Sequence, residues 1–258
     1  MNEGSRAEKN VYNIEQLGTF EVKERISQCP LLIAPLGGCE PFGSFGAVGA
    51  QSLCVKKVTD ALSERFSVLT SAVIPFGCST PFISFAGAAG VKPRTFVNML
   101  CEILHGYVFQ GICKIFVVNA APFNGEPAAE AMRRLEAKYH NVKCVLFNIY
   151  DCGINDMKNL TKGVDRNDEL ILSLVSYLSP EMIKENEGGL APFQSKTVSD
   201  TEYRNWKKRG RDPQKLAALF PQGTFLAPDT QLSAEQGKRF FERIVEDASA
   251  RLEALFKI

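Results

Sequence analysis

Histidine is nearly absent from the sequence, since His105 and His140 are the only two among 258 residues. Histidine is the commonest metal ligand in proteins and the usual general base beside a catalytic serine or cysteine. With two histidines, the chain has few ways to build a metal centre or a nucleophilic triad. His105 is expected inside a helix and His140 just after another helix, so neither is expected at the candidate site described below.

Long apolar runs and an excess of one charge are also absent. No stretch approaches the ~20 apolar residues of a membrane span. Because residues 5–9 are also largely polar, we expect no signal peptide, no membrane anchor and a cytoplasmic location. The 30 basic and 29 acidic side chains nearly cancel, which argues against nucleic-acid binding.

The eight cysteines contain no C-x-x-C pair. Most of them lie within apolar segments, where cysteine behaves as a small buried hydrophobic residue. We therefore interpret them as reduced thiols and expect no disulfide framework.

The chain has 258 residues, of which 45% are hydrophobic, and can bury one sizeable core. We expect a single domain over residues 1–258, with residues 188–225 as an insertion or an oligomer-contact segment, because that stretch mixes Gly, Pro and basic residues. The basic cluster in it is interpreted as a solvated face or a subunit contact, with anion binding as an alternative. Its members are Arg204, Lys207, Lys208, Arg209 and Arg211.

The stretch from Ile112 to Gly125 is the centre of the predicted fold. Residues 115–118 form a short, uncharged, largely β-branched run that ends at Asn119, which is typical of a strand buried on both faces. Small residues and a proline follow, and then residues 126–139 have apolar positions at helical spacing. Ligands of open α/β sheets bind at the carboxyl ends of the strands, so residues 119–124 are expected in the site.

The same succession of strand, loop and helix occurs elsewhere in the chain, which predicts a mostly parallel sheet with helices on both faces. Glycine-rich loops after two of the strands allow close backbone approach to a ligand. The other expected strands are residues 31–36, 71–76 and 142–150, and the other expected helices are residues 12–26 in part, 47–66, 93–108, 168–185 and 233–257. Ser233 is expected to cap the last helix, with Gln236 three residues later.

Cys39, Glu40 and Cys78 are the candidate catalytic residues of the first two loops. A thiolate at Cys39 or Cys78 would be able to attack an acyl carbon. The alternative is a pair of structural thiols, because neither has a histidine base or a positive neighbour in sequence. Glu40 is interpreted either as a base or as a relic carboxylate that is hydrogen-bonded to its loop.

Four short motifs, in this order, resemble the creatininase (creatinine amidohydrolase) family. The resemblance covers nearly the whole chain, and each motif has the strand, loop or helix context that the family requires. The motifs are Pro35-Leu-Gly-Gly-Cys-Glu40, Pro75-Phe-Gly-Cys-Ser79 with Phe85-Ala-Gly87, Val117-Val-Asn119 with Asn124, and Gly223 leading through Pro228 to Glu235-Gln-Gly237.

The resemblance implies a three-layer α/β/α fold, usually assembled as a hexamer. It also implies a pair of metal ions, zinc or manganese, that activate water to open a cyclic or linear amide. Such a centre needs histidine and carboxylate ligands on the loops.

The sequence departs from the family at most of these ligand positions. Glu40 matches, whereas Phe42, Gln51, Phe82 and Ala121 stand where the family has ligands or an adjacent glutamate-histidine pair. Phe123 replaces a further glutamate ligand of creatininase itself. The family also has a histidine and a glutamate later in the chain, and these align approximately with Arg166 and Ile171. One carboxylate cannot hold a divalent ion that prefers about four ligands, so we expect no metal cofactor.

Aromatic residues take the place of the missing ligands. One interpretation is a site plugged by core-like side chains, because unpaired buried ligands would be costly. The other is an apolar small-molecule cavity with a few polar anchors, Glu40 among them. The predicted pocket residues are Phe42, Phe45, Phe82, Asn119, Phe123 and Asn124.

Three functions fit these observations. The first is a creatininase-like protein without the family's metal-dependent amide hydrolysis. Such a protein would serve as a subunit of a homo-oligomer, for which the family's hexamer is the model, or of a complex with an active paralogue. The second is an amidohydrolase with a changed mechanism. The third is a small-molecule binding protein that uses the aromatic pocket.

Overall fold

The structure is a computed structural model that describes residues 11–152, 167–184, 198–208, 210–226, 230 and 232–256. In these residues five parallel strands form one sheet in the order β1-β3-β2-β4-β5. The strands are β1 (Tyr12–Asn13), β2 (Leu31–Leu36), β3 (Leu69–Thr70), β4 (Lys114–Asn119) and β5 (Lys143–Asn148). The prediction of a mostly parallel sheet is confirmed.

Strand β4 shows why its sequence carries no charge between Ile115 and Val118. Ile115 and Val117 pack into the core on one face of the sheet, and Phe116 and Val118 into the core on the other. Successive side chains of a strand point to opposite faces, so a strand covered on both sides must be apolar throughout. The two-sided burial expected from the sequence is therefore confirmed.

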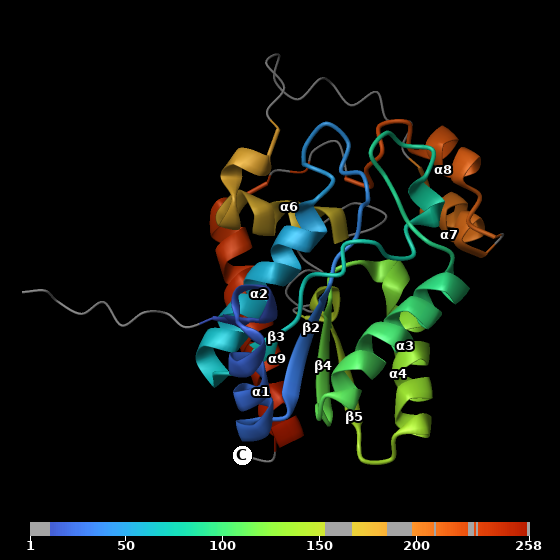
Figure 1. Ribbon diagram of the computed structural model, residues 1–258. Coiled ribbons are helices and arrows are strands. Elements are labelled where there is room, and N and C mark those ends of the chain that lie inside the picture. Colours follow the sequence, from blue (N-terminus) through green and yellow to red (C-terminus); the bar gives the residue numbers. More distant parts are fainter. Residues whose placement is uncertain are drawn as a thin grey trace, which may run out of the picture.

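Helices cover both faces and give three layers (Figure 1). One face carries α1 (Thr19–Gln28), α3 (Pro93–Phe109) and α4 (Gly125–Lys138), and the other carries α2 (Ala50–Phe66), α6 (Asn167–Leu178) and α9 (Ala234–Phe256). Two shorter helices, α7 (Asp200–Lys208) and α8 (Pro213–Leu219), lie towards the carboxyl ends of the strands. Within the described residues, no helix is both long enough and apolar enough to cross a bilayer.

In the described ranges, five single-turn 3-10 helices connect these elements. They are η1 (Ile14–Gln16), η2 (Thr80–Phe82), η3 (Pro122–Asn124), η4 (Ile149–Asp151) and η5 (Pro180–Met182). Four of them follow a strand or its loop, and of these η2, η3 and η4 lie at the carboxyl edge of the sheet. The predicted cap of α9 is confirmed, because the Gln236 amide donates to Ser233 Oγ over 3.3 Å.

The strand predicted at residues 71–76 is wrong, since β3 ends at Thr70. Ser71 donates to the Ile33 carbonyl, but the next amide bond to β2 runs from Ile74 to the Pro35 carbonyl, one residue later than a regular parallel ladder requires. Pro35 has no N–H to supply the intervening bond, and prolines inside sheets are confined to edges and bulges. The chain therefore leaves the sheet after Thr70 and rejoins it only as a bridge at Ile74.

Helix boundaries differ from the sequence pattern where proline intervenes. The helix predicted over residues 168–185 ends at Leu178, because Pro180 opens η5 instead. Helices α7 and α8 were not expected in the segment 188–225. In α8, Asp212 accepts from the Gln214 and Lys215 amides and Pro213 occupies the first turn, an arrangement typical of a helix start. Residues 188–197 and 209 of that segment lie outside the described residues.

Candidate functional site

The candidate site lies where β2, β4 and β5 end. The register aligns Leu36 with Asn119 and Asn119 with Asn148, so the three strands end at one level. Their loops therefore begin side by side at the carboxyl edge of the sheet, as the sequence predicts for residues 119–124.

Glu40 lies in the first of these loops and is buried, with 6% of its surface exposed. Its Oε2 atom accepts from Gln51 Nε2 over 2.8 Å, and its Oε1 atom accepts from Ser79 Oγ over 3.2 Å. Both carboxylate oxygens thus have donors from the protein itself, one from α2 and one from the second loop. We call Glu40, Gln51 and Ser79 the Glu40 cluster.

Gln51 also lies near Gly38, and so does Ala121, another position that the resemblance marks. An ideal Cβ built on Gly38 would lie 2.3 Å from Gln51 Oε1 and 3.1 Å from Ala121 Cβ. Gly38 is therefore needed for close approach, because a side chain there would collide with Gln51. The structure brings together Glu40, Gln51 and Ala121, three positions at which the family resemblance places metal ligands.

Asn124 joins two loops by its side-chain amide. Its Oδ1 atom accepts from the Cys78 backbone N–H over 2.8 Å, and its Nδ2 atom donates to the Gly37 carbonyl over 2.9 Å. A Cβ on Gly77 would come within 2.1 Å of Asn124 Oδ1, so the loop needs glycine there as well. Buried polar groups need hydrogen-bond partners, and both polar atoms of the Asn124 amide have one. These two hydrogen bonds fix the spacing between the loops.

Asn119 makes a separate polar group at the ends of β4 and β5. Its Nδ2 atom lies within hydrogen-bond distance of the Ala121 carbonyl (3.0 Å), Asn148 Oδ1 (3.1 Å) and the Tyr150 hydroxyl (3.2 Å). Burial raises the pKa of Tyr150, and the nearby Asp151 carboxylate raises it further, so the phenol is held neutral. Neither Asn148 nor Tyr150 was predicted from the sequence, although their place at the end of β5 and just after it was a usable signal.

Neither candidate cysteine has the environment of an activated thiolate. Burial raises the pKa of Cys78 to about 12; the Arg211 charge lowers it and the Glu40 charge raises it by smaller amounts. Burial and the charge of Glu40 raise the pKa of Cys39 as well, and its Sγ lies 3.3 Å from the Pro75 carbonyl. A neutral thiol is a poor nucleophile, so the geometry favours structural roles.

Phe82 and Phe123 lie edge to face, with ring centroids 5.4 Å apart. Phe82 also meets Phe225 at 6.0 Å, and Phe123 meets Trp206 at 6.4 Å. Residues from the predicted insertion therefore cover the second and third loops. We call this group the aromatic cluster, and its rings are Phe82, Phe123, Tyr203, Trp206, Phe220 and Phe225.

The structure does not bring Phe42 and Phe45 into the aromatic cluster. Both are buried in the core between the sheet and helices α2, α6 and α9. The four phenylalanines predicted around one pocket thus divide into two groups. Trp206 and Phe225 join the site from segments whose sequence gave no signal of this contact.

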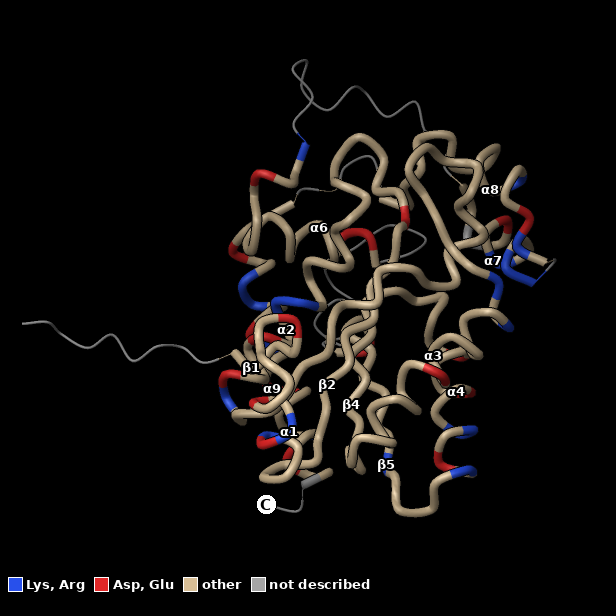
Figure 2. Tube along the Cα trace, in the orientation of Figure 1, with Lys and Arg blue, Asp and Glu red and all other residues tan. Residues whose placement is uncertain are grey.

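Basic side chains of the α7 region stack on the aromatic cluster. The Arg211 guanidinium lies 5.0 Å from the centroid of Phe123, and the Lys207 ammonium lies 4.4 Å from that of Tyr203. Arg211 has a φ of 57°, which is uncommon outside glycine. Figure 2 shows basic residues gathered at α7.

Asp168, at the start of α6, holds the chain segment that follows α8. Its Oδ2 atom accepts from Thr224 Oγ1 over 2.8 Å and from the Phe225 amide over 2.7 Å. Ile171, which aligns approximately with a late family ligand, is buried in the core. Arg166, the other aligned position, lies outside the described residues.

The two histidines lie elsewhere. His105 Nδ1 is 2.5 Å from the Tyr139 hydroxyl, and the two rings stack where α3 packs against α4. His140 follows the end of α4 and is exposed. Helix α4 begins at the loop after β4 and runs back along the sheet, so its last turn lies at the opposite edge from Glu40.

The donor set around Glu40 does not fit the family's pair of metal ions. Across the described ranges, no three His, Cys, Asp or Glu side chains are grouped so that they could hold a metal. Gln51 turns its amide nitrogen to Glu40, and Ala121 offers no donor. Such ions bind about four nitrogen, sulfur or oxygen ligands, and this arrangement supplies one carboxylate.

Comparison with known proteins agrees with the fold. Among curated proteins, 3-dehydro-scyllo-inosose hydrolase of Thermotoga maritima is 25% identical over 101 residues, which span 38% of this chain and only 32% of that protein. The structure titled "Creatininase Mn" has a TM-score of 0.74 at 15% identity and covers 95% of this chain and 98% of its own. A putative creatinine amidohydrolase from Bacteroides fragilis has a TM-score of 0.71 at 19% identity and covers 95% and 97%.

At these identities the solved structures establish a shared fold. A family model described as creatinine amidohydrolase matches residues 15–252. That range contains strands β2 to β5 and the loops that carry Glu40, Asn119 and Asn124. The chain therefore belongs to the creatininase family.

Proposed function

We propose that this chain is a creatininase-family protein without metal-dependent amide hydrolysis, which serves as a non-catalytic subunit. The observation that carries the proposal is the Glu40 cluster, in which Gln51 and Ser79 donate to the two carboxylate oxygens. Those are the oxygens that a metal ion would require. Ala121 lies beside Gly38, as Gln51 does, and its methyl group offers no ligand atom.

The aromatic cluster supports the same proposal. Phe82 is buried and stands where the resemblance places a glutamate-histidine pair, and Phe123 stands where it places a glutamate ligand. A buried apolar surface cannot solvate the charges of a metal-bound water or of an amide hydrolysis intermediate. The related creatininase whose title names manganese is therefore a guide to the fold of this chain and not to its chemistry.

An amidohydrolase with a changed mechanism is less well supported. It would need a nucleophile or base in place of metal-activated water. The pKa of Cys78 is raised to about 12, that of Cys39 is also raised, and both histidines lie outside the site. The Ser79 hydroxyl donates a hydrogen bond to Glu40 Oε1, so we interpret Ser79 as a residue that holds the carboxylate in place.

A small-molecule binding protein is the second candidate, and one observation favours it. Gln51 is 2% exposed, and its Oε1 atom has no hydrogen-bond partner within the described part of the chain. An unpaired buried acceptor is costly, so a ligand with an N–H or O–H donor would gain affinity there. This candidate keeps the same residues and differs in predicting a saturable ligand.

The subunit role draws support from exposed apolar side chains. Phe76 and Ile83, in or beside the second loop, are 50% and 56% exposed. Large apolar side chains that are exposed along one loop are candidates for a protein interface. We expect a homo-oligomer or a complex with an active paralogue, and light scattering that finds a monomer at micromolar concentration would remove this support.

The hydrolytic test uses creatinine and simple linear amides as substrates, with zinc or manganese supplied in excess. We expect no turnover above that of the Glu40→Gln variant, because that variant keeps the cluster's shape but loses the carboxylate. Turnover by the wild type that depends on added metal and disappears in Glu40→Gln would overturn the proposal. Saturable binding of an amide without turnover would instead select the second candidate.

A further inference from the structure

A cavity of about 560 Å³ lies between α1 and α3, away from the Glu40 cluster. Helix α1 leads directly into β2, and α3 leads into β4, so the ends of both helices lie at the amino edge of the sheet. The Glu40 cluster and the aromatic cluster lie at the carboxyl edge. This cavity therefore shares no residue with the site described above.

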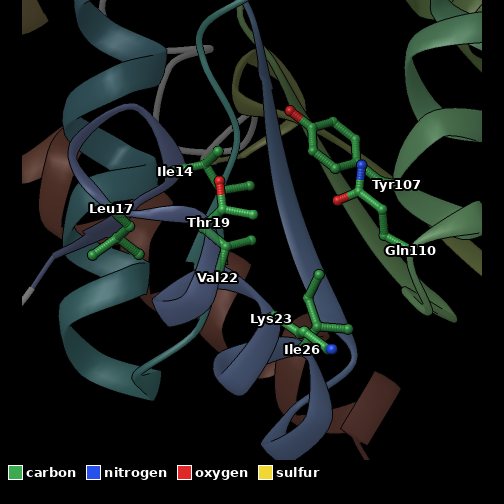
Figure 3. Close-up of a pocket in the computed structure, with 8 residues that line it drawn as sticks. All are labelled: Ile14, Leu17, Thr19, Val22, Lys23, Ile26, Tyr107 and Gln110. Atoms are coloured by element: carbon green, nitrogen blue, oxygen red, sulfur yellow. The ribbon is translucent and has the colours of Figure 1, made fainter.

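The floor of the cavity is apolar. Ile14, Leu17 and Val22 are only partly buried although they pack against the core beneath α1 and α3, and Ile26 completes this surface. A volume of this size is typical of small-molecule sites, which span roughly 300–1,000 Å³. Figure 3 shows Thr19 and Val22 on α1 facing Tyr107 of α3 and Gln110, the residue after α3, across the cavity.

Four of the eight lining residues carry a polar side-chain group, and two of these groups mark the ends of the cavity. Lys23 contributes an ammonium at the end nearest Ile26, and Tyr107 contributes its hydroxyl at the other end (Figure 3). Burial raises the pKa of Tyr107, and the Glu15 carboxylate raises it further, so its hydroxyl stays a neutral donor.

The carboxylates that flank Lys23 keep their charges, but each accepts a hydrogen bond within its own segment, as Glu24 does from Gln28 Nε2 over 3.2 Å. Glu21 accepts from the Gly18 amide over 2.7 Å, and Glu15 lies 3.4 Å from Asn13 Nδ2, so both are engaged by their own loop. Arg25 stacks on the Tyr12 ring with its guanidinium 3.6 Å from the centroid. In the described part of the chain, Lys23 forms no ion pair.

We propose that this cavity binds an amphipathic monoanion, a molecule with an apolar chain or ring and one carboxylate. The apolar body would lie on Val22 and Ile26, and the carboxylate would pair with the Lys23 ammonium. A lysine at the edge of apolar surface can lay its own methylene stem along the ligand and keep its charge at the opening. Gln110 and Tyr107 would accept or donate hydrogen bonds at the other end.

The experiment compares decanoate with decanol by isothermal titration calorimetry on the full chain. Lys23→Gln is expected to weaken decanoate binding about two- to fivefold and to leave decanol binding unchanged, because an exposed ion pair contributes modestly. Lys57→Gln, an exposed lysine of α2, is the matched control and should change neither affinity.

A second pair of variants tests the location. Thr19→Trp puts an indole at the cavity wall and should weaken both ligands at least severalfold. Thr95→Trp makes the same change in the first turn of α3, outside this cavity, and should have no effect. The proposal fails if decanoate does not bind at millimolar concentration, if Lys23→Gln affects both ligands equally, or if Thr19→Trp affects neither. Decanoate-independent self-association that Thr19→Trp abolishes would also overturn it, in favour of a second copy of the chain as the occupant.

Discussion

The Glu40 cluster and the aromatic cluster occupy the same edge of the sheet but differ in how the family's ligand positions have changed. In the first, Glu40 is retained and Gln51 keeps a polar side chain that donates to it. In the second, Phe82 and Phe123 are apolar and pack against rings from α7 and the segment after α8. One region remains polar and hydrogen-bonded, and the other has become part of a hydrophobic core.

This difference follows from what each position contacts. A carboxylate buried in a loop needs donors, so a residue beside Glu40 has to supply them if a metal ion does not. A loop that faces α7 and α8 is covered by apolar rings, and there an apolar residue adds stability through burial. We therefore expect the aromatic cluster to contribute more to the free energy of unfolding. The contribution of the Glu40 cluster should depend on the hydrogen bonds that its carboxylate accepts.

Phe82→Ala is expected to have the largest effect. Truncating a buried phenylalanine typically lowers the free energy of unfolding by about 3–5 kcal/mol. Urea denaturation followed by the fluorescence of Trp206, which packs in the same cluster, measures the loss. Phe109→Ala is the control, because Phe109 is 85% exposed and its removal should change stability by less than about 0.5 kcal/mol. Equal effects of the two variants would show that the cluster is not a core.

Gln51→Ala should cost less, about 1.5–3 kcal/mol, because it removes a hydrogen bond to a buried charged group. Glu40→Gln in the Gln51→Ala background should recover part of that loss, since the unpaired charge is then gone. A double-mutant cycle measures this coupling, and Gln28→Ala, at an exposed glutamine of α1, controls for the substitution itself. Additive effects of the two site mutations would mean that Gln51 does not hold Glu40.

Raising the pH should destabilise the protein through Cys78, which directly precedes Ser79 of the Glu40 cluster and is buried. Burial raises the pKa of Cys78 to about 12, whereas in the unfolded chain the thiol loses its proton near pH 9. A raised pKa stabilises the fold fully below the unfolded value, and this contribution is lost as the pH rises from about 9 towards about 12. The slope is at most about 1.4 kcal/mol per pH unit for one thiol.

Chemical denaturation at pH 8 and pH 10.5 checks this expectation. Other buried groups titrate in the same range, so the informative quantity is the difference between the wild type and Cys78→Ala. The variant should lose less stability over this interval. Identical slopes would place Cys78 in contact with solvent.

The sequence was a sufficient guide to strands β2, β4 and β5 and to the Glu40 loop. The uncharged run from Ile115 to Val118 predicted a strand with two buried faces, because each residue contacts one of two cores. Parallel strands end at one edge of the sheet, so Asn119, Asn124 and Glu40, which follow strand ends, were expected near one another. Both inferences rest on local pattern and on a general rule of the fold.

Contacts between distant segments were beyond the sequence pattern. Nothing in the sequence around Trp206 or Phe225 shows that their partners are Phe82 and Phe123, since packing depends on where α7 and α8 fold back. Phe42 looks equivalent to Phe82 in sequence, because both follow a proline, yet it turns into the core beneath α6. The bulge at Pro35 likewise arises from the pairing of two strands, which neither strand reveals alone.

The absence of a metal site at the Glu40 cluster is tested most directly by elemental analysis. The purified protein is incubated with zinc or manganese, and free metal is removed before the measurement. The account predicts no stoichiometric metal, because Gln51 and Ser79 occupy the Glu40 oxygens and Ala121 offers no ligand. The Glu40→Ala variant should give the same background as the wild type. One or two ions per chain in the wild type, lost in Glu40→Ala, would contradict the account.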